Sequence, residues 1–283
     1  IPAEYAGKPV TRIASGAFEG MLNITSVLLP DSIIEIGDRA FMSCSGITSI
    51  NIPDSVKKIG QAAFYGSGLK TINIGSGVNE IGQNAFGNCT KLESIIVSKA
   101  NTTYADESGV LYSFDRTELI RYPAGRTDEN YTIYNTVTHV RNFAFSYSQH
   151  LKSVTVGKSV VSLGDYTFLS CKKLENISLN QSLTFIGANT FDSCTSLTSV
   201  TIPEGVKTIG YLDGEIECGG SFIGCTALTE VNLPSTLVAI YQRSFEGCTS
   251  LARVNYAGSA GAWAAITIGE HNEPLTGAEI KFK

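Results

Sequence analysis

The sequence predicts a β-rich repeat solenoid with about 23 residues per turn, and three observations point to this class. A phenylalanine recurs at a nearly fixed spacing, aliphatic residues recur in step with it, and a short alternating apolar segment lies between successive phenylalanines. A fixed period between roughly 20 and 50 residues is the sequence signature of stacked repeats. Because equivalent strands of successive turns would lie side by side, we expect a mostly parallel, curved sheet.

The repeat phenylalanines define the period. The gaps between them are 23, 23, 22, 59, 23, 23, 31 and 23 residues. A large aromatic side chain at the same place in every turn predicts an aromatic spine through the core. The residues are Phe18, Phe41, Phe64, Phe86, Phe145, Phe168, Phe191, Phe222 and Phe245.

Each repeat also carries a Val-x-Ile type pair, as at Val200 and Ile202. Its period of two predicts a short strand with one buried face. Pro203 directly follows the pair and should end the strand, since proline cannot donate to a ladder; Pro30, Pro53 and Pro234 stand at the same place. The glycine that follows an aliphatic residue, as in Ile59-Gly60, indicates a turn with either positive φ or a close backbone approach.

Two segments break the period. In the 59-residue gap, residues 109–114 and 118–123 flank Asp115-Arg116-Thr117, which predicts a β-hairpin. We interpret residues 98–134 as a variant rung, with its hairpin near 109–123, inside the same solenoid. The second break inserts a loop at residues 211–220, and insertions in solenoids become loops on one face.

The expected organisation is therefore a solenoid over residues 1–255 and a C-terminal cap over residues 256–283. The first residues, Ile1-Pro2, match the end of a repeat strand, so we expect the solenoid to start in the middle of a repeat. The cap contains Trp263, and residues 279–283 alternate charged and apolar side chains, as suits an edge strand.

Composition excludes several function classes. The net charge is −5 and no cluster of Lys or Arg is present, so we expect no nucleic-acid partner. No apolar run reaches membrane-spanning length. The histidines, at positions 139, 150 and 271, have no catalytic neighbours that the sequence supports, and no glycine-rich phosphate loop occurs. We therefore expect a protein that is not an enzyme.

Six of the seven cysteines lie three residues after a repeat phenylalanine: Cys44, Cys89, Cys171, Cys194, Cys225 and Cys248. A 23-residue register is not a metal-ligand spacing, and cysteine often behaves as a small buried hydrophobe. We expect a ladder of free structural thiols, which a Cys171–Cys194 disulfide would contradict. The seventh, Cys218, lies in the inserted loop and either pairs with Cys225 or is free.

The inserted loop carries Asp213, Glu215 and Glu217 at alternate positions. In an extended segment these carboxylates point to one side and could hold a hard cation such as Ca²⁺. The alternative is a solvated acidic loop without a metal. No other cofactor is expected.

The outward residues of the strands form a ribbon of small hydrogen-bonding groups. One interpretation is that these side chains only stabilise the sheet through cross-strand pairs. The other is that the face binds a ligand, as solenoid faces usually do. The candidate binding residues are Ser49, Asn51, Thr71, Asn73, Ser153, Thr155, Asn176, Ser178, Ser199, Thr201, Glu230 and Asn232, and the same pattern extends to Ser26/Leu28, Ser94/Ile96 and Arg253/Asn255.

The repeats, such as residues 52–64, resemble the BspA-like (treponemal-type) leucine-rich repeats of bacterial surface proteins. The stretches 108–112 and 122–125 are similar to a variant rung of that family, and residues 256–272 to its C-terminal cap. The resemblance implies a right-handed leucine-rich-repeat solenoid of the α/β class in a secreted or surface-attached bacterial protein. It implies an adhesin or protein-binding module for extracellular or host surface proteins or glycans, and no catalytic residues.

Two alternatives remain open beside adhesion. The chain could be a structural spacer that displays other domains and has no ligand of its own. An enzyme that uses the loop at residues 211–220 would need a concave pocket with convergent polar groups there. The solenoid itself is expected to be a monomer.

Overall fold

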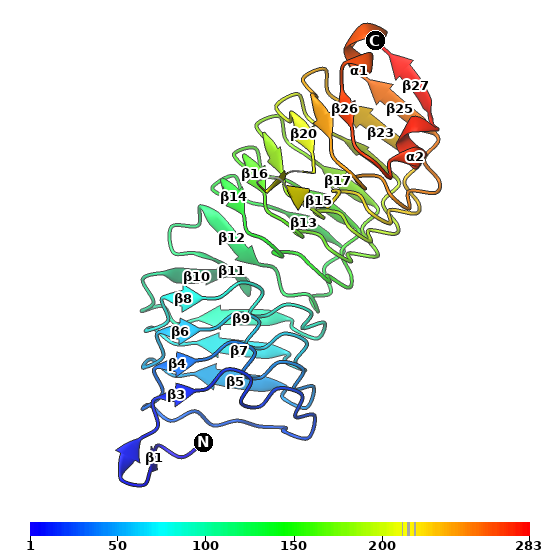
Figure 1. Cartoon of the computed structure of the whole chain (residues 1–283). Helices are drawn as coiled ribbons and strands as arrows, with labels where there is room; N and C mark the ends of the chain where they lie inside the picture. The colour runs from blue at the N-terminus through cyan, green and yellow to red at the C-terminus, as the bar shows by residue number, and fades with distance from the viewer. Residues whose placement is uncertain (211, 214–215, 218) are drawn as a thin grey trace. The chain divides into compact units, whose positions relative to one another are not determined.

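A computed structural model describes residues 1–210, 212–213, 216–217 and 219–283, with no description of the side chains from 211 to 218. The chain forms two compact units, Ile1–Arg126 and Thr127–Lys283. Each unit is a β-solenoid built from mostly parallel sheets (Figure 1), and the chain makes about 11 turns of about 23 residues. The predicted fold class is therefore confirmed. The boundary between the units falls inside the segment 98–134 that the sequence marks as a variant rung.

The N-terminal unit contains two parallel sheets, one hairpin at its start and one antiparallel sheet at its end. The starting hairpin pairs β1 (Glu4–Tyr5) with β2 (Lys8–Pro9). One parallel sheet has the order β3 (Arg12–Ile13), β4 (Glu35–Ile36), β6 (Lys58–Ile59), β8 (Glu80–Ile81). The other has the order β5 (Ser49–Ile52), β7 (Thr71–Ile74), β9 (Ser94–Val97). The antiparallel strands are β10 (Tyr104–Glu107), β11 (Val110–Ser113) and β12 (Glu118–Arg121).

The C-terminal unit repeats the arrangement with four parallel sheets. Its first two are β13 (Asn130–Thr132), β15 (Ser153–Thr155), β17 (Asn176–Ser178), and β14 (His139–Val140), β16 (Ser162–Leu163), β18 (Phe185–Ile186). The next has the order β19 (Ser199–Thr201), β23 (Glu230–Leu233), β25 (Arg253–Tyr256), β27 (Glu279–Phe282). The last has the order β20 (Thr208–Ile209), β24 (Ala239–Ile240), β26 (Thr267–Ile268).

A short strand pair and two short helices complete the described part of this unit. Strands β21 (Leu212–Asp213) and β22 (Ile216–Glu217) form an antiparallel pair. The helices α1 (Ala260–Ala264) and α2 (Glu273–Thr276) have five and four residues. Within the described part of the chain, no helix has the length and apolar character that crossing a membrane requires.

The predicted aromatic spine is present in both units. In the N-terminal unit the rings of Phe18, Phe41, Phe64 and Phe86 stack with centroids 5.1, 5.3 and 6.0 Å apart. In the C-terminal unit the centroid distances run from 4.9 to 5.4 Å, between Phe145, Phe168, Phe191, Phe222 and Phe245. All but the first ring are buried, so the spine forms the centre of each core.

The backbone around the spine forms a further ladder of hydrogen bonds between turns. The N–H of Phe41 donates to the carbonyl of Ala63 over 2.7 Å, and that of Phe168 donates to Thr190 over 2.7 Å. In each case the acceptor belongs to the residue before the next repeat phenylalanine. At Phe245 the acceptor is instead the side-chain Oδ1 of Asn272, 2.9 Å away. The buried Asn272 also donates to the carbonyls of Tyr241 and Gly269, so it closes this ladder.

The repeat cysteines are buried and free, as the sequence predicts. Their thiols have a partner that the sequence does not reveal. Cys44 donates to the carbonyl oxygen of Phe18 over 2.9 Å, and Cys194 donates to that of Phe168 over 3.2 Å. Desolvation by burial raises the pKa of Cys194 well above its usual range. The third position after the repeat phenylalanine thus holds a compact side chain that also donates a hydrogen bond to the preceding turn.

At Gly60 and Gly82 the glycine of the Ile-Gly pair is explained by close approach, whereas Gly210, which follows Ile209, has a φ of +74°. A Cβ atom at Gly60 would lie 2.5 Å from the backbone nitrogen of Asp38, and one at Gly82 would lie 2.4 Å from that of Gln61. Neither residue has a positive φ. The turns therefore stack too closely at Gly60 and Gly82 for a side chain.

The predicted hairpin is confirmed and is part of a larger antiparallel sheet. Strands β11 and β12 pair as expected, and β10 pairs with β11 on the other side. The turn is held by Asp115, whose Oδ1 accepts from the hydroxyl of Ser113 over 2.7 Å and from the N–H of Thr117 over 3.1 Å. These bonds hold the pKa of the Asp115 carboxyl below its usual range.

Candidate interaction surface

The outward side chains of the longer strands fall into columns because the strands pair in register. In the N-terminal unit Ser49 lies beside Thr71, and Asn51 lies beside Asn73. The intervening isoleucines point into the core, and Asn51 and Asn73 are exposed. The amide of Asn73 donates to Oδ1 of Asn51. We call these four residues the N-terminal ribbon.

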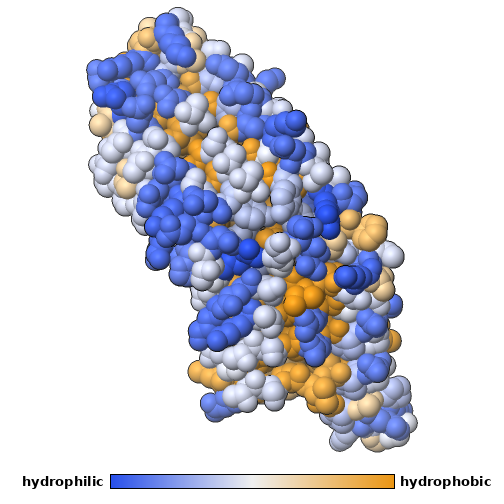
Figure 2. All heavy atoms as spheres, turned by 180° about the vertical axis from the view of Figure 1, so that it is seen from behind, coloured by the Kyte–Doolittle hydropathy of each residue, from blue (hydrophilic) through white to orange (hydrophobic). Residues whose placement is uncertain are grey.

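Apolar residues border the N-terminal ribbon. Ile96 follows Asn73 in register and is 48% exposed, and Leu28 is 82% exposed. Figure 2 shows hydrophobic surface gathered over the N-terminal unit on the side turned to the viewer, with hydrophilic residues among it. The polar N-terminal ribbon therefore has an exposed aliphatic side chain, Ile96, directly beside it.

In the C-terminal unit the same columns begin on β15 and β17. Ser153 pairs with Asn176, and Thr155 pairs with Ser178. Thr155, Asn176 and Ser178 are exposed, and Ser153 is half-buried. Together with the outward residues of β19, β23 and β25 they make up what we call the C-terminal ribbon.

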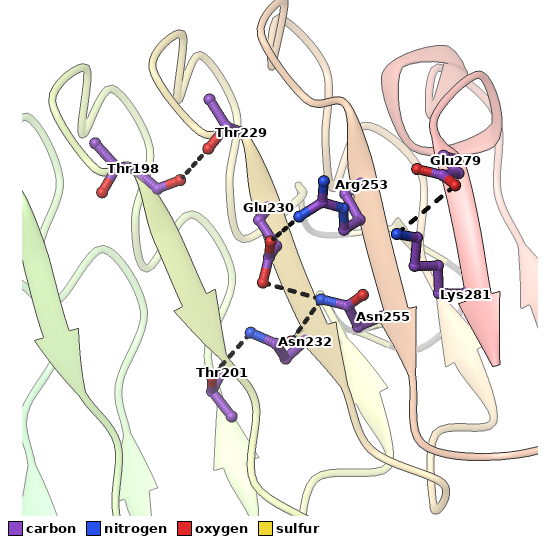
Figure 3. A network of polar contacts seen from close by, with 9 residues as sticks. All are labelled: Thr198, Thr201, Thr229, Glu230, Asn232, Arg253, Asn255, Glu279 and Lys281. Carbon is purple, nitrogen blue, oxygen red and sulfur yellow. Dashed lines mark hydrogen bonds and ion pairs between the residues drawn. The ribbon is translucent and has the colours of Figure 1, made fainter. Parts of the chain in front are cut away.

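Strands β19, β23 and β25 carry the most connected part of the C-terminal ribbon (Figure 3). The amide of Asn232 donates to the hydroxyl of Thr201 over 3.1 Å. Asn255 donates to Oδ1 of Asn232 and to Oε1 of Glu230, both over 2.9 Å. The other carboxylate oxygen of Glu230 accepts from Arg253 over 2.9 Å. The side chains of three neighbouring strands thus fix one another in place, with Ser199 exposed at their edge.

A shallow hollow of about 180 Å³ opens beside this network, at the ends of the same strands. Thr201, Asn232 and Asn255 contribute to its wall, and Pro203, Pro234 and Lys283 are also among its lining residues. The hollow is therefore bounded by the hydrogen-bonded column on one side and by the strand-ending prolines on another. A ligand seated here would meet both donors and acceptors in fixed positions.

The calcium hypothesis and the pairing of Cys218 concern residues that are not described. Glu215 and Cys218 lie outside the described residues, as do the side chains of Asp213 and Glu217. Over the rest of the chain, no group of three or more His, Cys, Asp or Glu side chains is placed to hold a metal ion. Both hypotheses, and the idea of an enzyme site in this loop, stay untested predictions.

The sequence predicts which side chains face outward, but it does not show how they bond. The bonds from Arg253 and Asn255 to Glu230 depend on the register of β23 and β25, in which Glu230 lies beside Arg253. The hollow depends on Lys283 at the end of the chain, which no repeat pattern places there. The one available signal was the return of Asn at positions 232 and 255, 23 residues apart.

The repeat pattern matches a known family. The family described as BspA type Leucine rich repeat region matches in six copies, over residues 11–121, 126–212 and 218–262. A comparison with curated protein sequences gives no match.

Solved structures with the same fold include bacterial cell-surface proteins. A leucine rich cell surface protein from Faecalibacterium prausnitzii A2-165 is 26% identical, with 94% of this chain and 89% of that chain covered and a TM-score of 0.65. A leucine-rich repeat protein from Eubacterium ventriosum is 28% identical, covers 94% and 79%, and has a TM-score of 0.72. The pneumococcal vaccine antigen PcpA is 21% identical, covers 100% and 88%, and has a TM-score of 0.68, which shows the shared fold.

Proposed function

The chain belongs to the BspA type leucine-rich repeat family, and from this premise we propose that it is a non-enzymatic interaction module displayed on or secreted from a bacterial cell. Leucine-rich repeat proteins mediate protein interactions, and one solved relative is itself a cell surface protein. Adhesion to extracellular or host surface proteins or glycans is the activity that this combination supports best. The module acts as a monomer in this proposal.

The observation that carries the proposal is the C-terminal ribbon. Neighbouring parallel strands lie about 4.8 Å apart, so the ribbon repeats its hydrogen-bonding groups at that interval. Ser199 and Thr201 are exposed, and Glu230 and Asn232 are half-buried next to them. Few large aromatic side chains lie in these columns, which favours many modest polar contacts over a single anchoring residue.

A structural spacer is the second candidate, and one observation favours it. The amides of Asn232 and Asn255 donate to neighbouring ribbon residues, so part of the ribbon's hydrogen-bonding capacity serves the sheet itself. Cross-strand pairs of this kind stabilise a sheet with no ligand present. The two functions differ in whether the exposed groups, such as Ser199 and Thr155, have anything to bind.

Binding assays with matched variants separate the two. Purified protein is tested against immobilised extracellular-matrix proteins and a glycan array, together with Ser199→Arg and Thr155→Arg. Both serine and threonine are exposed on the ribbon, so a long charged side chain should block contact without disturbing the core. Thr267→Arg, at an exposed position of β26 in the other sheet, is the control.

We expect wild type and Thr267→Arg to bind the same partner with equal affinity. Both ribbon variants should bind it at least about tenfold more weakly, which is a loss of about 1.4 kcal/mol in binding free energy. Equal binding by all four proteins would place the contact elsewhere on the molecule. A folded wild-type protein that binds no member of the panel would favour the spacer.

A further inference from the structure

A pocket of about 420 Å³ lies in the N-terminal unit, where β9 meets the antiparallel sheet of the variant rung. Its volume is in the range of roughly 300–1,000 Å³ that is usual for small-molecule sites. Ile96 and Phe114 provide its apolar lining, and Lys99, Asp106 and Arg116 are among its polar lining residues. The pocket is separate from the C-terminal ribbon, because all of its residues belong to the other unit.

The apolar residues of this pocket are not required by the fold. Ile96 stands in register with Asn73 and Asn51, where the repeat carries amides, and its side chain is 48% exposed. Phe114 does not belong to the aromatic spine, and its side chain is 56% exposed. Two large apolar side chains that leave the core and line the same pocket indicate a surface that is covered by a ligand.

The backbone that carries the ring of Phe114 is held by hydrogen bonds. Its own N–H donates to the carbonyl of Thr103 over 2.9 Å. The next residue, Asp115, closes the turn by accepting from Ser113 and Thr117. Because these bonds already hold the backbone, no loop has to be ordered when a ligand packs against the ring of Phe114.

The charged residues of the pocket balance one another. Asp106 accepts from the N–H of Val97 through Oδ1 over 2.8 Å, and Arg116 forms an ion pair of 2.9 Å with Glu107. Lys99 is exposed at the rim. An anionic ligand would be repelled by the carboxylate of Asp106, and a cationic ligand would be repelled by Lys99 and Arg116. A purely apolar ligand would remove water from all three charged groups without replacing its hydrogen bonds, which is unfavourable.

A neutral ligand with many hydroxyl groups avoids these costs. Each hydroxyl both donates and accepts, so it can bond to a carboxylate on one side and to an ammonium or guanidinium group on the other. A pyranose ring also has a face of C–H groups that packs against an aromatic ring and an aliphatic side chain. We propose that this pocket binds one pyranose unit of a glycan, with Phe114 and Ile96 under the ring and Lys99, Asp106 and Arg116 around its hydroxyls.

The site goes beyond the proposed function, because adhesion through the C-terminal ribbon and sugar binding in this pocket can fail independently. The experiment follows the methyl signal of Ile96 by NMR in the whole chain while methyl β-D-galactopyranoside, methyl β-D-glucopyranoside or methyl α-D-mannopyranoside is added. Saturable shifts of this signal with at least one glycoside are expected. N-acetyl-phenylalanine methylamide is the apolar probe that represents a peptide side chain.

Three variants sharpen the test. Phe114→Ala removes the exposed ring and should weaken binding about tenfold, and Phe282→Ala, which removes an exposed ring far along the chain, should leave it unchanged. Asp106→Asn keeps the Oδ1 acceptor for Val97 and removes one charged acceptor for a hydroxyl, so it should weaken binding without loss of folding. Circular dichroism checks that all variants are folded.

The proposal is overturned if no glycoside shifts the Ile96 signal, or if a folded Phe114→Ala binds as tightly as wild type. It is also overturned if only the apolar probe binds, which would mark the pocket as a site for a peptide side chain. Wild-type behaviour of the ribbon variants in this titration is expected in every case, and their failure to bind sugar would contradict the separation of the two sites.

Discussion

The thiol of Cys194 donates to the carbonyl oxygen of Phe168 in the preceding turn, with the sulfur and oxygen atoms 3.2 Å apart. The same bond connects Cys171 to Phe145 and Cys248 to Phe222. A repeat position that looks like a place for any small side chain is therefore a place for a small hydrogen-bond donor. The turns that lack cysteine have Met21, Ser67 and Ser148 at this position, so two of the three keep a small hydrogen-bonding side chain there.

Replacing Cys194 with alanine removes the donor and leaves a small cavity, so we expect the free energy of unfolding to fall by about 1–3 kcal/mol. Cys194→Ser keeps a hydroxyl donor at this position; Ser148, the serine found there in another turn, donates to the carbonyl of Phe145 of its own turn over 2.6 Å. The serine variant should therefore lose less stability than the alanine variant. Chemical denaturation of the three proteins measures this, and equal losses would show that the donor is unimportant.

The buried thiols should also be unreactive in the native protein. Burial raises the pKa of Cys194, so the reactive thiolate is scarcer at pH 8 than for an ordinary thiol with a pKa of about 8.5. We expect iodoacetamide to modify the six repeat cysteines slowly in buffer and quickly in guanidinium chloride. Peptide mapping gives the result for each cysteine, and a peptide pair joined by a Cys171–Cys194 disulfide would contradict the free-thiol ladder.

Gly60→Ala tests the close approach of neighbouring turns. The added Cβ would lie 2.5 Å from the nitrogen of Asp38, which cannot move without disturbing its own turn. We expect a loss of about 1–3 kcal/mol or more from overpacking. Gly261→Ala in α1 is the matched control, because the nearest atom to its added Cβ lies at 3.9 Å. A helix interior favours alanine over glycine, so this control should be neutral or slightly stabilising. A thermal melt distinguishes the two outcomes.

Asn272→Ala should destabilise the C-terminal end of the solenoid. It removes the acceptor for the N–H of Phe245 and the donors to Tyr241 and Gly269, all in a buried place. We expect a loss of about 2–4 kcal/mol, since several buried groups lose their partners together. Asn176→Ala, at an exposed position, should change little. Hydrogen exchange at the amide of Phe245 gives a local readout, and unchanged protection there would contradict the capping role.

Much of the fold could be predicted from the sequence because each turn uses the same residues for the same task. The spacing of Phe41 and Phe64 predicts the stacked rings, and the Val-x-Ile pairs predict the longer strands. What could not be predicted was β10, whose segment Tyr104–Glu107 has no repeat pattern and gains its strand conformation by pairing with β11. The hydrogen bond from the thiol of Cys194 was also hidden, because its acceptor is a main-chain atom 26 residues away.

The candidate surfaces were only partly predictable. Alternation shows that Asn232 and Glu230 face outward, and equal spacing shows that Asn255 lies near Asn232. The pocket at Ile96 was not foreseen, because a lone isoleucine in a column of polar residues carries no information about a hairpin that folds against it. Such a site forms from residues that interrupt the repeat. The repeat period therefore does not predict which of these residues lie next to one another.

The ladder beside the aromatic spine gives the solenoid a direction. Every repeat phenylalanine whose bond is described donates forward along the chain, as Phe41 does to Ala63 and Phe222 does to Ser244. This ladder has N–H donors at its leading, C-terminal face and carbonyl acceptors at its trailing, N-terminal face. Other bonds between turns donate backward, as from the N–H of Gly60 to the carbonyl of Ile36. Asn272 can close the leading face because its side chain offers an acceptor there, and the same amide oxygen would be useless at the trailing face. A cap for this ladder must therefore supply an acceptor at the C-terminal face, as Oδ1 of Asn272 does, and would have to supply a donor at the N-terminal face.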